Sequence, residues 1–326
     1  MKAIVHTKYG SPDVLQFKEI EKPSPKDNEV LIKIHAVSVN AYDWHLMRGE
    51  PFIARIFAGF PKPKTTILGA DIAGRVESIG KKVQQFKVGD AVFGDLAGTG
   101  ASGFAEYVCA NENRLVLKQT SMTFEEAAAM PMASVTALQG LRDSGQIQAG
   151  KKVLINGAGG GVGTFAVQIA KSYGAEVTAV CSTRNVELVR SLGADYVIDY
   201  TKNDFTKMGK CYDLILAANG YHSLAEYKRV LNPNGIYVMT GGSNAQIFQA
   251  LLLGPWMSMN GNQKMGNLEA KPNQKDLAFV KELFEAGKVK PVIDRRYPLN
   301  EVPEAIRYLE QGHAKGKVVI NVVSEK

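Results

Sequence analysis

The sequence predicts an α/β protein in which a doubly wound parallel sheet lies in the middle of the chain, after a β-rich region. Two observations carry this prediction. From Lys151 onward, short apolar segments of strand length alternate with helical patterns, which is typical of a parallel sheet covered by helices on both faces. The first of these strands runs into a glycine-rich loop and then a helix, in the stretch KKVLINGAGGGVG from Lys151 to Gly163. The commonest order, in which such a sheet begins the chain, is therefore excluded.

Strands and turns dominate the first third of the chain. Apolar and β-branched segments bounded by Gly, Pro, Asn or Asp predict strands at Ala3 to Thr7, Val30 to Ser38, Gly69 to Ile79 and Ala91 to Phe93. The pattern then becomes helical. Thr123 is a suitable N-cap, and Glu126, three residues later, completes a capping box. A helix is predicted from here to Pro131, and a second from Ser134 to Asp143.

The alternating region starts with a strand from Lys152 to Asn156. The helix after it has one apolar face, formed at helical spacing by Val162, Phe165, Ala166, Ile169, Ala170 and Tyr173. Further strands are predicted at Glu176 to Val180, Tyr196 to Ile198, Asp213 to Ala217 and Gly235 to Thr240, with a helix from Asn185 to Leu192. The chain closes with helices from Gln274 to Ala286 and Val302 to Gln311, a strand around Val292 and a strand from Lys317 to Val322.

The glycine loop indicates a dinucleotide site. Strand, glycine turn and helix form the opening unit of a dinucleotide-binding fold, in which the backbone approaches a pyrophosphate and the helix N-terminus offers free N–H groups to it. The G-x-G-x-x-G fingerprint matches Ala158-x-Gly160-x-x-Gly163, with alanine in the first position. The alternative is a flexible glycine turn without a ligand.

Composition excludes several classes of protein. At 326 residues the chain is long enough for two domains. No apolar run reaches the roughly 18–20 residues that span a bilayer, and the N-terminus lacks the features of a signal peptide, so a cytoplasmic location is expected. The net charge of +7 is spread along the chain without a basic cluster, and no nucleic-acid partner is expected. Three distant cysteines form no CxxC pair, so neither a disulfide scaffold nor a thiolate zinc site is expected.

Short motifs in a fixed order cover almost the whole chain. They are Asn40-x-x-Asp43 with Arg48-Gly49, Leu68-Gly-Ala-Asp71-Ile-Ala-Gly74, Phe86-x-x-Gly89-Asp90-x-Val92, Gly103-Phe-Ala-Glu-Tyr107, Ala128-Ala-x-Pro131, Thr136-Ala137, the glycine loop, Gly193-Ala-Asp195 and Gly312-His-Ala-Lys-Gly-Lys317. In these motifs the chain resembles the medium-chain dehydrogenase/reductase superfamily, and more closely its zinc-free quinone oxidoreductase and enone reductase branch. The resemblance implies a GroES-like β domain, residues 1–120 and 260–326, around an inserted Rossmann domain, residues 121–259.

The chain departs from the zinc-dependent alcohol dehydrogenases of that superfamily. Those enzymes place a zinc-binding cysteine near Asn40 or Ala41, and a Gly-His-Glu where this chain has Gly69-Ala70-Asp71. The four-cysteine loop that holds their structural zinc, expected near residues 94–102, is also missing. Because a metal cannot be held without ligands, we expect a zinc-free enzyme.

The residues after the second strand of the alternating region favour NADPH over NADH. An NAD-preferring site carries an Asp or Glu about 20 residues past the glycines, bound to the ribose 2′-hydroxyl. Here the segment Ser182-Thr183-Arg184-Asn185 offers hydroxyls and a guanidinium instead, which suit a 2′-phosphate. The resemblance adds Tyr200. Alternatively, Arg184 is an ordinary solvated residue of a first helical turn. The full set predicted to bind NADPH is Asn40, Asp43, Thr136, Ala158, Gly160, Gly161, Val162, Gly163, Ser182, Thr183, Arg184, Asn185, Tyr200, Asn219, Gly241, Gly242 and Lys317.

The expected chemistry is hydride transfer to an electron-poor acceptor. Without zinc a secondary alcohol is not easily polarised, so the substrate is predicted to be a small hydrophobic quinone or an α,β-unsaturated carbonyl. The protein then supplies orientation and a hydrogen-bond donor for the developing oxyanion. Tyr42 and His45 are the predicted catalytic donors. Alternatively, Tyr42 packs in the interior and His45 lies on a helix surface.

Two further questions stay open on the sequence alone. The apolar run from Phe248 to Met257 suits a substrate pocket, a subunit contact or ordinary core, and the resemblance allows a homodimer. The alternative to an enzyme is a protein that binds NADPH without turnover, as a redox sensor or a nucleic-acid-binding protein on the same fold.

Overall fold

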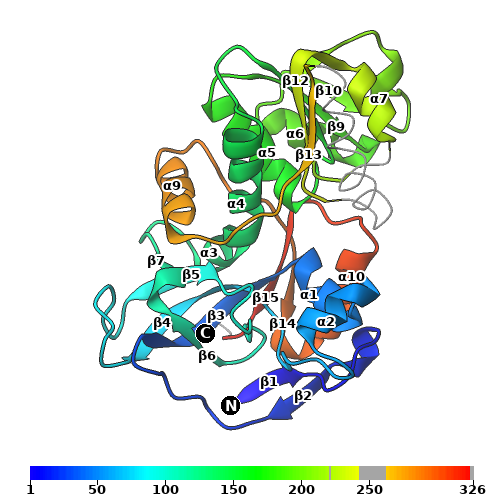
Figure 1. The fold of residues 1–326 in the computed structure, drawn as a ribbon. Coiled ribbons are helices and arrows are strands. Elements are labelled where there is room, and N and C mark those ends of the chain that lie inside the picture. Colours follow the sequence, from blue (N-terminus) through cyan, green and yellow to red (C-terminus); the bar gives the residue numbers. More distant parts are fainter. Residues whose placement is uncertain (220–221, 242–261, 324–326) are drawn as a thin grey trace. The chain divides into compact units, whose positions relative to one another are not determined.

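The computed structural model describes residues 1–219, 222–241 and 262–323 (Figure 1). Contacts divide the chain into two compact units. Unit 1 comprises Met1–Met132, Pro272–Lys281 and Pro291–Lys326, and unit 2 comprises Ala133–Lys271 and Glu282–Lys290. The limits predicted at residues 120 and 260 for separate domains stay a prediction.

Unit 1 is built on a mainly antiparallel sheet. Within the described residues its strands follow the order β14-β15-β3-β4-β5-β7, and β6 pairs with β3. The strands are β3 (Glu29–Val39), β4 (Asp71–Ile79), β5 (Ala91–Asp95), β6 (Tyr107–Asn111), β7 (Leu115–Leu117), β14 (Ile293–Pro298) and β15 (Lys317–Asn321). A separate antiparallel pair joins β1 (Lys2–Val5) to β2 (Gln16–Glu19). Strand β3 therefore lies between β4, which follows the turn at Gly69, and β15, the last strand of the described chain.

Unit 1 also contains short helices, which are α1 (Ala41–Arg48), α2 (Arg55–Ala58), α3 (Phe124–Ala129) and α10 (Val302–Glu310). Of these, α3 and α10 pack on the sheet of the unit. Helix α3 begins at the predicted capping box, in which the Thr123 side chain accepts a hydrogen bond from the backbone N–H of Glu126. Helix α10 packs against β14, β15 and α1. Apolar residues of β3, β4, β15 and α10 form one buried core.

Unit 2 contains an entirely parallel sheet in the order β10-β9-β8-β11-β12-β13. The strands are β8 (Lys152–Asn156), β9 (Glu176–Cys181), β10 (Tyr196–Asp199), β11 (Tyr212–Ala217), β12 (Leu231–Met239) and β13 (Lys264–Asn267). The chain passes from β8 outward to β10, and then returns to β11 on the other side of β8. The strand order reverses between β8 and β11, which is where doubly wound sheets bind their ligands. The predicted α/β class is confirmed.

The helices of unit 2 follow the strands in the expected alternation. They are α5 (Gly161–Ser172), α6 (Val186–Ser191) and α7 (Leu224–Arg229), while α4 (Pro131–Gln139) and α9 (Gln274–Glu285) each contain residues of both units. Helix α5 contacts β8 and β9 through its predicted apolar face, since Phe165, Ala166, Ile169 and Ala170 are all buried. Pro131 begins α4 instead of ending the helix before it, because a proline at the first helical position loses no hydrogen bond.

Candidate active site

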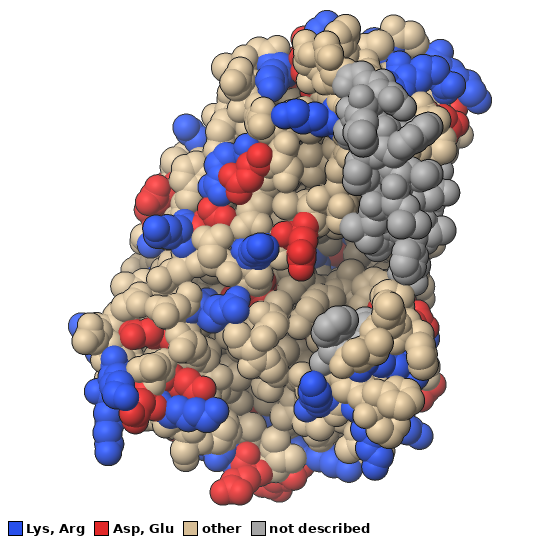
Figure 2. All heavy atoms as spheres, viewed as in Figure 1, with Lys and Arg blue, Asp and Glu red and all other residues tan. Residues whose placement is uncertain are grey.

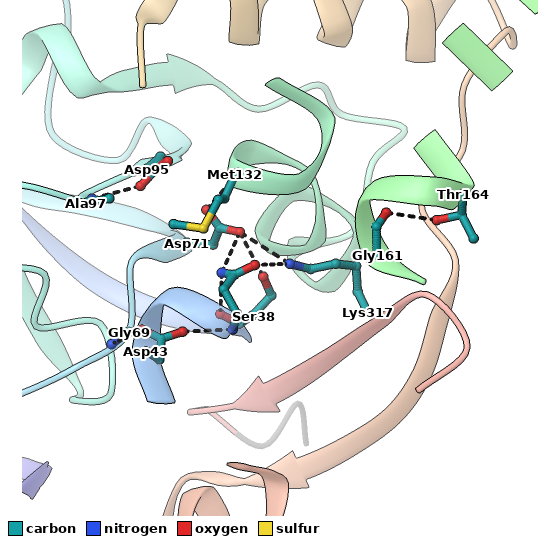
Figure 3. Close-up of polar contacts among 11 residues, drawn as sticks. Ser38, Asp43, Gly69, Asp71, Asp95, Ala97, Met132, Gly161, Thr164 and Lys317 are labelled. Carbon is teal, nitrogen blue, oxygen red and sulfur yellow. Dashed lines mark hydrogen bonds and ion pairs between the residues drawn. The ribbon is translucent and has the colours of Figure 1, made fainter. Parts of the chain in front are cut away.

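The sheet register of unit 1 gathers buried polar side chains at one end of β3 (Figure 3). In the pairing of β3 with β4, Ser38 lies opposite Asp71, and Asp71 in turn lies opposite Asp95 of β5. On the other side of β3, Lys317 is the first residue of β15. Asn40 connects the end of β3 to α1. Asp71 is fully buried and Lys317 is 3% exposed, so this cluster is shielded from solvent.

Asp71 is the centre of the cluster. Its Oδ2 accepts hydrogen bonds from the Ser38 hydroxyl and the Asn40 amide, both at 3.0 Å, and Lys317 Nζ lies 3.6 Å from the same oxygen. Its Oδ1 accepts the backbone N–H of Met132 at 2.9 Å. Burial raises the pKa of Asp71, and the ammonium of Lys317 acts in the opposite direction. Each group hydrogen-bonded to Asp71 is a donor, so the ionised carboxylate is the form that these groups fit.

Asp71 also fixes the orientation of the Asn40 and Lys317 side chains. The Asn40 amide nitrogen is bound to Asp71 and to the Ser38 carbonyl, so its oxygen accepts a hydrogen bond from Lys317 Nζ. Burial lowers the pKa of Lys317, and Asp71 raises it. Asn40 and Lys317 were both predicted to bind the cofactor, and the structure brings them together. Asp71 was not among the residues predicted to act in catalysis or to bind the cofactor.

Asp43 is a structural residue at the start of α1. Its Oδ2 accepts the backbone N–H of Asn40 at 2.8 Å and its Oδ1 accepts that of Gly69 at 2.9 Å. Burial raises the pKa of Asp43 to about 7. Both oxygens are therefore used to join α1 to the turn before β4, and contact between Asp43 and the cofactor stays a prediction.

Tyr42 lies on α1 with its hydroxyl in a hydrogen bond to the backbone of Gly98. Its hydroxyl oxygen accepts the backbone N–H of Gly98 at 3.1 Å. Burial raises the pKa of Tyr42, and the bond from Gly98 lowers it. No acceptor for the hydroxyl proton is found in the described part of the chain. Donation of this proton to a substrate oxygen stays a prediction.

His45 is arranged differently. Its Nδ1 lies 3.1 Å from the carbonyl oxygen of Glu50, and its ring stacks on Trp44 with centroids 3.7 Å apart. A carbonyl only accepts, so Nδ1 carries the proton and Nε2 of the neutral ring has none. Burial lowers the pKa of His45, which favours the neutral ring. In this state Nε2 is an acceptor, and the donor roles of Tyr42 and His45 both stay predictions.

The glycine loop of unit 2 lies at the carboxyl end of β8, beside β11. Gly157 follows Asn156 with a φ of 83°, a conformation that glycine adopts without strain. A Cβ on Gly163 would lie 2.1 Å from the carbonyl oxygen of Gly157, so the close approach of α5 to the loop requires glycine there. A Cβ on Gly160 would meet only that oxygen, at 3.6 Å, and the space beside Gly160 is open.

The segment after β9 contains one feature that sequence reasoning missed. The Thr183 hydroxyl donates to Asp199 Oδ2 at 2.6 Å, and this bond is the main cause that lowers the pKa of Asp199. The carboxylate is therefore ionised, with Lys202 Nζ 3.7 Å away. A carboxylate thus does stand beside Ser182–Asn185, supplied by the end of β10. Only the parallel pairing of Asp199 with Cys181 reveals it.

Comparison with known proteins places the chain in a family. Residues 26–120 match the family described as "Alcohol dehydrogenase GroES-like domain", and residues 192–320 match "Zinc-binding dehydrogenase". The "Chloroplast envelope quinone oxidoreductase homolog" of Arabidopsis thaliana is 36% identical over 98% of both chains. The "NADPH-dependent alkenal/one oxidoreductase, chloroplastic" of the same organism is 35% identical, over 98% of this chain and 79% of the relative. The structure of the quinone oxidoreductase from Coxiella burnetii is 30% identical over 99% of both chains, with a TM-score of 0.89.

The chain belongs to the medium-chain dehydrogenase/reductase superfamily. Its relatives lie in the quinone oxidoreductase and enone reductase branch, which confirms the predicted resemblance and the GroES-like and Rossmann folds of the two sheets. The chain is an oxidoreductase that binds NAD(P)H. The relatives are named as enzymes, so the alternative of a non-catalytic NADPH-binding protein is not favoured.

Two features of unit 2 fit the dinucleotide of this superfamily. The first is the open space beside Gly160, at the N-terminus of α5. The second is Asn185, which is buried next to Gly159 and whose side-chain Oδ1 has no partner in the described residues. A bound nucleotide would fill the open space beside Gly160 and would give the Asn185 Oδ1 a hydrogen-bond partner.

The other residues predicted to bind the cofactor lie on several elements of the superfamily fold. Ala158, Gly161 and Val162 belong to the loop and the first turn of α5, and Tyr200 follows β10 with its side chain 55% exposed. Thr136 is buried on α4. Asn219 follows β11 and Gly241 follows β12, at the same carboxyl edge of the sheet. Gly242 and the run from Phe248 to Met257 lie outside the described residues.

Where the zinc-dependent members were expected to have a cysteine and a Gly-His-Glu, this chain has Asn40 or Ala41 and Gly69-Ala70-Asp71. Among residues 1–219, 222–241 and 262–323, no three His, Cys, Asp or Glu side chains are grouped so that they could hold a metal ion. Independence from zinc stays a prediction. In the same residues no helix is both long and apolar enough to cross a bilayer.

Proposed function

We propose that this chain uses NADPH to reduce small hydrophobic substrates in which a C=C bond is conjugated to a carbonyl, namely quinones and α,β-unsaturated ketones or aldehydes. The observation that carries the proposal is the hydrogen bonding of the Tyr42 hydroxyl. Its oxygen accepts a hydrogen bond from the Gly98 N–H, which leaves its own proton for a substrate. The names of the relatives support both substrate classes, since one is named a quinone oxidoreductase homolog and another an alkenal/one oxidoreductase.

The proposed role of Tyr42 follows from where charge develops. NADPH, when bound, would supply a hydride, and addition of that hydride to the β-carbon of the substrate would leave negative charge on the carbonyl oxygen. A hydroxyl that donates to this oxygen stabilises the charge before a proton is taken up. The N–H of Gly98 makes the hydroxyl a better donor, because it withdraws charge from the phenol oxygen.

The proposed preference for NADPH rests on Arg184 and its neighbours after β9. Arg184 and Thr183 are exposed there and Ser182 is partly exposed, so an anionic 2′-phosphate has access to them. The carboxylate of Asp199 opposes this preference, and Lys202 offsets its charge. A guanidinium binds a phosphate through two parallel hydrogen bonds, which the 2′-hydroxyl of NADH does not offer.

Loss of reduced nicotinamide absorbance tests both parts of the proposal. Turnover of 1,4-benzoquinone or 3-buten-2-one with NADPH is expected, and turnover of neither would contradict it. A lower KM for NADPH than for NADH is expected to disappear in Arg184→Ala, because alanine offers no cation to the 2′-phosphate. Arg190→Ala removes an exposed arginine of α6 that pairs with Glu187, and is the matched control. A preference for NADH in the unmodified protein would overturn the cofactor assignment.

Location and assembly are further parts of the proposal. A cytoplasmic location stays a prediction, since the names of relatives include chloroplastic and mitochondrial proteins. A homodimer also stays a prediction, to be tested by light scattering on the purified protein. No nucleic-acid partner is proposed.

A further inference from the structure

Four large apolar side chains project into solvent from one short segment of unit 1. Phe52, Ile53, Ile56 and Phe60, here called the apolar patch, are 66%, 60%, 68% and 70% exposed. They occupy the turn before α2, α2 itself and the residues after it. Single exposed apolar residues are common on proteins, but four within nine positions form a patch of the kind that marks an interaction surface.

The segment under the apolar patch is held in place by Arg55. Its guanidinium donates to the carbonyls of Gly49 and Arg48 at 3.1 and 3.0 Å, and lies 4.6 Å from the ring centroid of Tyr9. The Tyr9 hydroxyl donates to the carbonyl of Gly59 at 2.6 Å. These bonds tie both ends of α2 to the rest of unit 1. The apolar side chains therefore point outward from a fixed base.

The surroundings of the apolar patch are basic. Lys8, Lys62 and Lys64 are exposed, and none of the three forms an ion pair in the described part of the chain, whereas Glu50 is the one exposed carboxylate between residues 48 and 64. Figure 2 shows Lys and Arg side chains, with some Asp and Glu among them, around the surface at the lower right, where Figure 1 draws α1 and α2. The chain as a whole carries a net charge of +7.

We propose that the apolar patch and its three lysines dock this protein onto an anionic lipid surface. Apolar side chains that enter the headgroup region, surrounded by lysines that face lipid phosphates, are the two features that bind proteins peripherally to membranes. A second copy of the chain fits less well, because a two-fold contact would bring the same lysines of both copies together. The proposal does not depend on the reaction proposed above.

Co-sedimentation with lipid vesicles tests the docking surface. The full-length protein is expected to pellet with vesicles of phosphatidylcholine containing about one third phosphatidylglycerol, and to stay in solution with pure phosphatidylcholine. Ile53→Ser with Ile56→Ser, and separately Lys62→Glu with Lys64→Glu, are expected to weaken binding about tenfold or more. These positions are exposed, so the variants are expected to fold, and circular dichroism checks this.

Matched controls separate this surface from charge or hydrophobicity in general. Val88→Ser changes an apolar residue that is 62% exposed outside the apolar patch. Lys81→Glu with Lys87→Glu alters the net charge as much as the lysine pair near the patch does. Both controls are expected to bind as the unmodified protein does. Failure of the unmodified protein to pellet with anionic vesicles, or equal losses in patch and control variants, would overturn the proposal. So would a dimer, found without lipid, that Ile53→Ser with Ile56→Ser converts to monomers.

Discussion

Two neighbouring side chains of α1, Tyr42 and His45, differ in what they can donate. The Tyr42 hydroxyl accepts from Gly98 and keeps a free proton, whereas Nδ1 of His45 is bound to the Glu50 carbonyl. We expect Tyr42→Phe to lower kcat about 100-fold, the cost of removing one donor to an oxyanion. The KM for NADPH should change little, because the phenol oxygen is not among the groups proposed to hold the nucleotide. Steady-state kinetics with 3-buten-2-one measures both.

His45→Phe is the comparison for that experiment. Because neutral His45 has no proton on Nε2, its loss is expected to lower kcat less than tenfold. A loss in His45→Phe as large as in Tyr42→Phe would mean that the histidine is a donor and would contradict the assignment.

Asp95 gives the stability of the protein a defined pH dependence. Burial and the charge of Asp71 on the paired strand raise the pKa of Asp95 from 3.8 to about 7. Between these two pH values the folded state holds a proton that the unfolded state has lost. The contribution of Asp95 to stability is therefore complete below pH 3.8 and is lost as the pH rises to about 7.

Asp95→Asn removes this titration and keeps an oxygen for the Ala97 N–H, which Asp95 accepts at 2.7 Å. The free energy of unfolding of Asp95→Asn, relative to the unmodified protein, should rise by up to about 1.4 kcal/mol per pH unit between pH 5 and 7 and level off above pH 7. Denaturant titrations across this range measure it. Glu19→Gln removes an exposed carboxylate as control, and a difference independent of pH would contradict the prediction.

Site residues could be predicted where a short continuous sequence motif contains them, and not where they depend on a contact between distant residues. Gly160 and Gly163 lie in one continuous motif between a strand and a helix, so the sequence indicated them directly. Asp199 is 16 residues from Thr183, and its carboxylate reaches the hydroxyl only because β10 pairs with β9. No local pattern contains that pairing. The cofactor site predicted from the sequence therefore lacked a carboxylate that the structure places there.

At the scale of elements, long regular patterns were predicted from the sequence and short elements were not. The long alternation of strands and helices after Lys151 was predicted well, since each strand is an uninterrupted apolar segment. Helix α1 has eight residues and was not predicted as an element, because its start depends on a bond from the Asn40 N–H to Asp43 and its position on a bond from the Gly69 N–H. The second of these contacts joins residues distant in sequence.

Substitution of two glycines near the start of α5 is expected to have different effects, one on stability and the other on cofactor binding. Gly163→Ala forces a Cβ against the Gly157 carbonyl, 2.1 Å away, and should lower the free energy of unfolding by about 1–3 kcal/mol. Gly160→Ala has open space and should cost less than about 1 kcal/mol, but it should weaken NADPH binding at least about tenfold because the Cβ enters that space. Denaturation and NADPH fluorescence titration measure the two effects.

Each glycine variant is the control for the other. If Gly160→Ala bound NADPH as tightly as the unmodified protein does, the open space beside Gly160 would not be part of the nucleotide site. If Gly163→Ala were as stable as the unmodified protein, the close approach of α5 to the loop would tolerate a side chain.

At the scale of the whole molecule, the order of elements along the chain predicted the inserted sheet but not the order of strands within each sheet. The position of the glycine loop within the chain predicted an inserted parallel sheet, and unit 2 is indeed bounded on both sides in sequence by segments of unit 1. The order of strands within each sheet could not be predicted, because the pairing of β15 with β3 joins residues that are far apart in the chain. That pairing places Lys317 beside Asn40 and Asp71.

The same cluster predicts how the protein responds to removal of metal ions. Asp71, in the segment where zinc-dependent members of the superfamily were expected to have ligands, is directed to Ser38, Asn40 and Lys317, and the buried ammonium of Lys317 supplies a positive charge beside it. We therefore expect dialysis against EDTA to leave both turnover with NADPH and the unfolding temperature unchanged, whereas a zinc site would lose its bound metal and, with it, folding or catalytic free energy. Elemental analysis before dialysis is the control. One zinc ion per chain, together with activity that EDTA removes and added zinc restores, would contradict the prediction.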